Sequence, residues 1–145
     1  MSILQLHVRR AATVLALAAL LGACSHGPHH PGGHDVTLTG AQEVPANTST
    51  ASGSSSIRVA HDRSVSGGVS YTGMLATVAH IHEAPVGANG PVIVPLVKTA
   101  DGMFAVPAGT LLTPSQHASY QAGNLYVNVH SAAYPAGEIR AQLKP

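Results

Sequence analysis

The chain has 145 residues, the length of a single domain. Apolar residues make up 45% of it and charged residues only 9%, and no stretch has the periodicity of a helical bundle. The formal charge of +1 becomes slightly negative when residues 1–23 are set aside, because Arg9 and Arg10 lie within them. With so few basic residues and no basic run, the composition excludes a nucleic-acid-binding protein.

Residues 1–23 are typical of a secretory signal peptide. A short basic segment ends at Arg9 and Arg10, and an apolar run over residues 11–21 follows it. That run is too short to cross a hydrocarbon layer of about 30 Å as a helix. We therefore expect the signal peptide to be removed during export.

The signal ends in Leu-Gly-Ala before Cys24, the single cysteine of the chain. Small residues directly before a cysteine resemble the lipobox of bacterial lipoproteins, which implies cleavage before Cys24 and attachment of membrane lipid to its thiol. Ser25 in place of aspartate implies sorting to the outer membrane. The prediction is an exported cell-envelope lipoprotein facing the periplasm or the cell surface. The alternative is an ordinary signal peptide that leaves Cys24 as a free thiol.

Residues 24–34 are rich in glycine, proline and histidine, which predicts a tether without regular structure. Fully extended, such a tether reaches roughly 30–35 Å. Histidine-rich tracts chelate zinc, copper or nickel, so one interpretation is a weak metal site and the other is a polar spacer. The histidines concerned are His26, His29, His30 and His34.

After the tether, short alternating segments are separated by Gly, Pro, Asn and Ser, which predicts strands at intervals of about ten residues. We expect them over residues 36–39, 54–61, 64–73, 76–82, 91–97, 103–106, 125–130 and 137–143. Ile57 and Val59 are expected to point inward, and Ile139, Ala141 and Leu143 are expected to share one face of their strand.

One short helix is predicted among the strands. Thr113 and Gln116 have the spacing of a capping box, with Pro114 at the first helical position. Gly123 provides the stop about two turns later. Many short strands with one helix predict an all-β fold, an antiparallel β-sandwich or Greek-key barrel, over residues 35–145.

Five segments, in order along the chain, together resemble the CHRD domain, a family first described in chordin and found in many secreted bacterial proteins. They are LTGAQEVP (38–45), ASG (51–53), AHIH (79–82), GANGPV (87–92) and YVNVHSAAYPAGEIR (126–140). The resemblance covers residues 35–143. It implies a β-sandwich or barrel outside the cytoplasm and implies little about chemistry.

Three histidines form a candidate metal site. His80 and His82 are two residues apart, so on a strand they project from the same face with Cα atoms about 6.5–7 Å apart. His130 ends another predicted strand, on the face that also carries Asn128. If these strands are neighbours, three imidazoles meet, and three nitrogens suit copper or zinc.

Carboxyl groups near this candidate site have expected roles too. Glu83 and Glu138 are expected to accept hydrogen bonds from the imidazoles and so fix their tautomers. Glu138 and Arg140 are expected to form a structural ion pair or to protect a sheet edge. In the alternative interpretation, His80 and His82 are structural residues that bond to the loop following them.

The His-x-His-Glu stretch also resembles the copper-binding strand of Cu/Zn superoxide dismutases. Only His80 and His82 match that strand, and the bridging histidine, zinc loop and disulfide have no counterpart. The sequence contains no nucleophile elbow and no complete catalytic constellation. We therefore expect a binding module that holds copper or zinc or engages an envelope or extracellular protein. The alternatives are a dismutase-like metalloenzyme and a purely structural or adhesive envelope protein.

Overall fold

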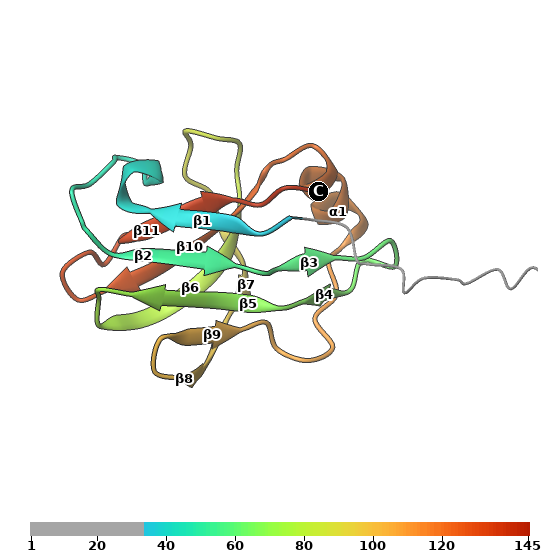
Figure 1. The fold of residues 1–145 in the computed structure, drawn as a ribbon. Coiled ribbons are helices and arrows are strands. Elements are labelled where there is room, and N and C mark those ends of the chain that lie inside the picture. The colour runs from blue at the N-terminus through green and yellow to red at the C-terminus, as the bar shows by residue number, and fades with distance from the viewer. Residues whose placement is uncertain (1–33) are drawn as a thin grey trace, which may run out of the picture.

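The computed structural model describes residues 34–145, which form strands, one α-helix and one short 3₁₀-helix (Figure 1). The strands are β1 (Val36–Thr39), β2 (Ser52–Ser55), β3 (Arg58–Val59), β4 (Val65–Ser66), β5 (Gly68–Thr72), β6 (Ala76–Glu83), β7 (Val92–Pro95), β8 (Val97–Ala100), β9 (Met103–Ala105), β10 (Leu125–Ser131) and β11 (Ile139–Gln142). The 3₁₀-helix η1 spans Gly40–Gln42, and α1 spans Pro114–Gln121. The predicted signal peptide, Cys24 and the tether histidines His26, His29 and His30 lie outside the described residues.

Nine of the strands form one antiparallel sheet in the order β7-β6-β10-β11-β1-β2-β5-β9-β8, and β3 pairs with β4. The two edge strands, β7 and β8, are separated in the chain by Leu96 alone. The backbone N–H of Leu96 donates to the carbonyl of Ala79 in β6, at 2.9 Å, where the two edges approach each other. The sheet thus nearly closes into a barrel, and the predicted all-β fold is confirmed.

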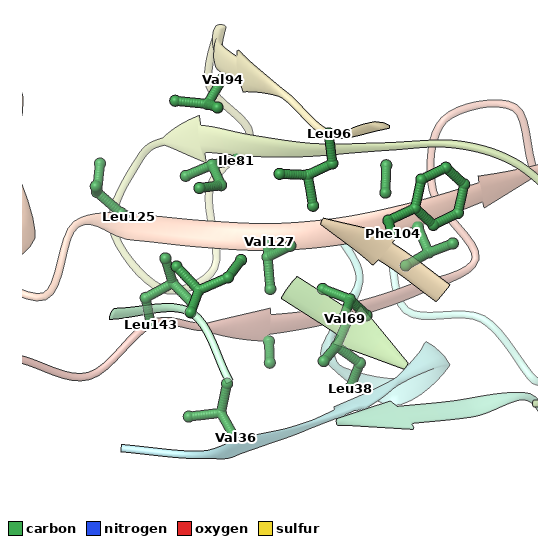
Figure 2. Packing of buried hydrophobic residues seen from close by; sticks show 14 of the residues in the cluster. Val36, Leu38, Val69, Ile81, Val94, Leu96, Phe104, Leu125, Val127 and Leu143 are labelled. Atoms are coloured by element: carbon green, nitrogen blue, oxygen red, sulfur yellow. The ribbon is translucent and has the colours of Figure 1, made fainter. Parts of the chain in front are cut away.

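The core lies between the facing parts of this sheet. Because side chains alternate along a strand, each strand sends every second residue inward, and Figure 2 shows these apolar side chains pointing toward one another. Leu38, Leu125 and Val127 are completely buried. Ile57 and Val59, which were predicted to point inward, are buried, and so are the residues predicted to share one face, Ile139, Ala141 and Leu143.

Helix α1 begins and ends where the sequence predicts. The Thr113 hydroxyl accepts from Gln116 N at 3.1 Å, and Gln116 Oε1 accepts from Thr113 N at 2.9 Å, which completes the capping box. Gly123 follows the helix with φ of 75°, a conformation that favours glycine. Buried Tyr120 is the side chain through which the helix packs on the core.

Three predicted strands differ from the observed ones. The predicted strands 54–61 and 64–73 are each divided in two, at residues 56–57 and at Gly67. Gly67 has φ of 93°, and a Cβ there would lie 2.3 Å from the carbonyl oxygen of Ser56. The predicted strand 91–97 ends at Pro95, and β8 was not predicted, because its residues are all exposed and give no hydrophobic alternation.

Candidate metal centre

The candidate site lies on the outer face of the sheet, where β6 and β10 are antiparallel neighbours. Their register places Asn128 opposite His80, Tyr126 opposite His82 and His130 opposite Val78. The two strands that carry the histidines are therefore adjacent, which the sequence alone does not show. One ring nitrogen from each of His80, His82 and His130 lies within 4.8 Å of the others.

Strand β10 is buried on both faces. Its inward residues belong to the core, and its outward residues, Tyr126, Asn128 and His130, are covered too, so that all seven of its residues are buried. His82 is also buried, at 8% exposure, whereas His80 is half-buried. The histidine cluster is thus enclosed except on the side of His80.

Backbone carbonyls orient two of the three imidazoles. His82 Nδ1 lies 2.9 Å from the Gly90 carbonyl oxygen, and His130 Nδ1 lies 3.0 Å from that of Pro135. A carbonyl oxygen can only accept, so each Nδ1 carries a proton, and Nε2 is the nitrogen that offers a lone pair to a metal ion in the neutral form of the ring. Such partners fix ring orientation in metal sites. His82 Nε2 is buried without a hydrogen-bond partner.

The electrostatics of the cluster favour neutral imidazoles. Burial is the largest cause lowering the pKa of His80, and the neighbouring His130 and His82 lower it further. Burial also lowers the pKa of His82, against the opposing effect of its bond to Gly90. Both rings are therefore held in the form that binds metal ions.

The nitrogen geometry can be compared with that of a metal site. Metal–nitrogen bonds of 2.0–2.1 Å place the ligand atoms of a tetrahedral site about 3.3 Å apart. His80 Nδ1 lies 3.1 Å from His130 Nε2, which fits that separation. Since the whole set lies within 4.8 Å, the remaining imidazole needs an inward shift of at most about 1.5 Å.

Glu83 and Glu138 do not orient the imidazoles, contrary to expectation. Glu83 accepts a hydrogen bond from Ser119 Oγ at 2.5 Å, and Glu138 accepts one from Ser49 Oγ at 2.6 Å. Glu83 follows His82 directly in β6, so strand alternation turns it to the opposite face. The bond from His82 to Gly90 is the one predicted by the structural interpretation, and it also fixes the tautomer.

Arg140 neither protects a sheet edge nor, within the described residues, forms an ion pair with Glu138, the two roles expected from the sequence. Strand β11 lies between β10 and β1, so Arg140 does not protect a sheet edge. Its guanidinium is buried, with Cζ 3.4 Å from the centre of the Tyr126 ring. The Tyr126 ring in turn stacks on His82, with centroids 4.7 Å apart and planes 6° from parallel.

Arg140 also holds the loop that covers the cluster. It donates to Asn89 Oδ1 at 3.0 Å and to the Ala88 carbonyl at 2.8 Å. The same loop is bonded to β10 as well, because Gly90 N donates a hydrogen bond to the Tyr126 hydroxyl at 3.3 Å. The carbonyl that orients His82 is therefore anchored to the sheet from two strands.

Sequence reasoning missed Glu43, which follows η1 and is buried beside this network. Burial raises the pKa of Glu43 to about 7, while Arg140 acts to lower it. Its Oε1 atom is buried without a hydrogen-bond partner. A single glutamate in a short connecting segment gives no periodic signal, and only the fold brings it to the sheet.

Among the histidines of the tether, His34 is described, and it is exposed and outside the cluster. Its backbone N–H donates to the Lys144 carbonyl at 3.3 Å, beside the C-terminus. In the described part of the chain, no helix is long and apolar enough to cross a membrane.

A nearly closed antiparallel sheet with a histidine cluster on its outer face defines a small all-β domain. The family model for the CHRD domain matches residues 35–143, and the chain belongs to the CHRD domain family. CHRD domains occur in extracellular proteins. No curated protein matches the chain, and no solved structure matches it.

Proposed function

We propose that this CHRD domain is an extracytoplasmic module that binds one copper or zinc ion through His80, His82 and His130. The observation that carries the proposal is the unpartnered, buried Nε2 of His82, in a ring whose Nδ1 is already bonded to Gly90. Leaving a buried polar atom unpaired costs about 1–3 kcal/mol. A metal ion would compensate this cost, whereas a purely structural histidine would not need to incur it.

The proposed role is binding and not catalysis. The carboxyl groups of Glu83 and Glu138 are engaged by serine hydroxyls, which leaves neither as a proton donor or acceptor at the cluster. The half-buried His80 is the side from which an ion would enter and leave. These features support a module that holds or passes on a metal ion.

The proposal is tested by calorimetric titration of the full chain with Zn²⁺ and Cu²⁺. The four tether histidines are replaced by asparagine, so that only the domain contributes imidazoles. We expect one ion per chain at micromolar affinity or tighter. The His80→Ala/His82→Ala variant should bind at least about 100-fold more weakly.

The matched control is His61→Ala/His117→Ala, which removes two histidines outside the cluster. It should bind as the parent does. Equal binding by the parent and the His80→Ala/His82→Ala variant would overturn the proposal.

We also propose that the domain is held at the cell envelope by lipid on Cys24. The support is the Leu-Gly-Ala-Cys sequence that ends the apolar run, together with the occurrence of CHRD domains in extracellular proteins. Residues 24–34 then serve as the tether between lipid and domain.

A further inference from the structure

Asn128 lies at the centre of the histidine cluster. It is 1% exposed, it stands directly opposite His80 in the register of β6 and β10, and it is two residues from His130 on the same face. Its side-chain oxygen, Oδ1, lies 2.9 Å from His130 Nε2. This separation is close to that of two ligand atoms on one tetrahedral ion, about 3.3 Å.

The contact between Asn128 and His130 brings two acceptors together. Because His130 Nδ1 donates to the Pro135 carbonyl, Nε2 is the acceptor nitrogen in the neutral form of the ring. Oδ1 of Asn128 also presents only lone pairs. These two atoms lie within hydrogen-bond distance, so either a proton on Nε2 or a metal ion between them holds them together, and an ion would take the place of that proton.

The orientation of the Asn128 amide has a structural cause. A Cβ at Gly137 would lie 2.5 Å from Glu43 Oε1 and 2.7 Å from Asn128 Nδ2, so the glycine makes room for the carboxyl and the amino group beside each other. Nδ2 of Asn128 therefore lies on the side of Glu43, although Glu43 Oε1 has no hydrogen-bond partner. The oxygen is thereby directed into the cluster.

We propose, on the basis of the metal site proposed above, that Asn128 Oδ1 is the fourth donor to the ion. Three imidazole nitrogens and one amide oxygen complete a tetrahedral set. Oxygen is a hard donor that favours divalent ions, whereas Cu⁺ is selected by soft ligands. Asn128 therefore makes the site selective for Zn²⁺ or Cu²⁺ over Cu⁺.

Two variants of the full chain with substituted tether histidines test this role. Asn128→Ala removes the oxygen. Asn128→Asp/Glu43→Gln exchanges amide and carboxylate, which keeps the buried pair and its charge while placing an anionic oxygen at the ion. Affinities for Zn²⁺ and Cu⁺ are measured, and the visible absorption of bound Co²⁺ reports the coordination number.

We expect Asn128→Ala to weaken Zn²⁺ binding about tenfold, a loss of about 1.4 kcal/mol, with Cu⁺ affinity changed less than about twofold and the Co²⁺ spectrum altered. The exchanged pair should bind Zn²⁺ at least as tightly as the parent.

Equal weakening of Zn²⁺ and Cu⁺ in Asn128→Ala would mean that Asn128 only positions His130, and it would overturn the inference. Unchanged Zn²⁺ affinity would do the same. If the parent binds no metal, the proposed function fails and this inference fails with it.

Discussion

Glu43 gives the metal-free protein an unusual dependence of stability on pH. The folded pKa of about 7 lies above the ordinary value of 4.5, so the folded state holds this proton more tightly than the unfolded chain does. The carboxyl therefore adds stability that is fully present below pH 4.5 and is lost as the pH rises to about 7. The amount is about 3 kcal/mol at most.

The prediction is that Glu43→Gln removes this loss. The free energy of unfolding is measured in urea with a chelator present, at about pH 5 and about pH 8. The difference between variant and parent should be more favourable to the variant at about pH 8 than at about pH 5, by about 1 kcal/mol or more. Histidine titration is common to both proteins and cancels in the comparison. A stability difference that is the same at both pH values would contradict the assignment.

Burial is the main cause that lowers the pKa values of His80 and His82, whereas it raises the pKa of Glu43. Both imidazoles therefore stay neutral to a lower pH than free imidazoles do. Protonation removes the lone pair that binds metal, and it begins below the ordinary imidazole value of about 6.5. Zinc affinity should therefore stay constant from about pH 8 down to about pH 6.5 and fall in more acidic solution. Titrations at several pH values check this, and a decline already above neutral pH would be inconsistent with buried, neutral ligands.

Strand β10 shows both what the sequence can predict and where it fails. The alternation of Leu125, Val127 and Val129 with polar residues predicts a strand and its inward face, and both are correct. The polar face is typical of a solvated surface, yet it is buried. Alternation reports the pleat of one strand, whereas this burial depends on loops contributed by distant parts of the chain.

The pairing of β6 with β10 is a similar case. The His-x-His pattern predicts two imidazoles on one face, but nothing local shows which strand lies beside them. More than 40 residues separate the two strands, so their adjacency is a property of the sheet order. The capping box of α1, by contrast, is entirely local and was fully predictable.

The loop over the cluster makes Arg140 important for stability. Arg140→Met removes the donors to Asn89 and Ala88 and leaves ionised Glu43 without its positive neighbour. We expect a loss of about 3 kcal/mol or more in urea unfolding at about pH 8. Arg58→Met is the matched control, because Arg58 pairs with exposed Asp35 and should cost about 1 kcal/mol or less. Similar losses in both variants would contradict this role.

At the scale of the whole molecule, His34, where the described chain begins, and the histidine cluster lie in different regions of the domain. His34 bonds to Lys144 beside the C-terminus, which lies next to α1 (Figure 1). Strand β10 leads away from α1, and His130 lies five residues beyond Leu125, about 17 Å at the usual rise per residue. The tether therefore joins the domain away from the cluster.

This arrangement predicts that anchoring and metal binding are separable. Cys24→Ser removes the thiol to which lipid would be attached, so the exported chain should move from the membrane fraction to the soluble fraction and lose incorporation of labelled fatty acid. Its zinc affinity should equal that of the parent, because residues 24–34 could, fully extended, span roughly 30–35 Å between the proposed lipid and the domain. A Cys24→Ser chain that remains with the membrane would contradict lipid anchoring. A changed zinc affinity would show that the anchor and the cluster are coupled, against the separation that the fold indicates.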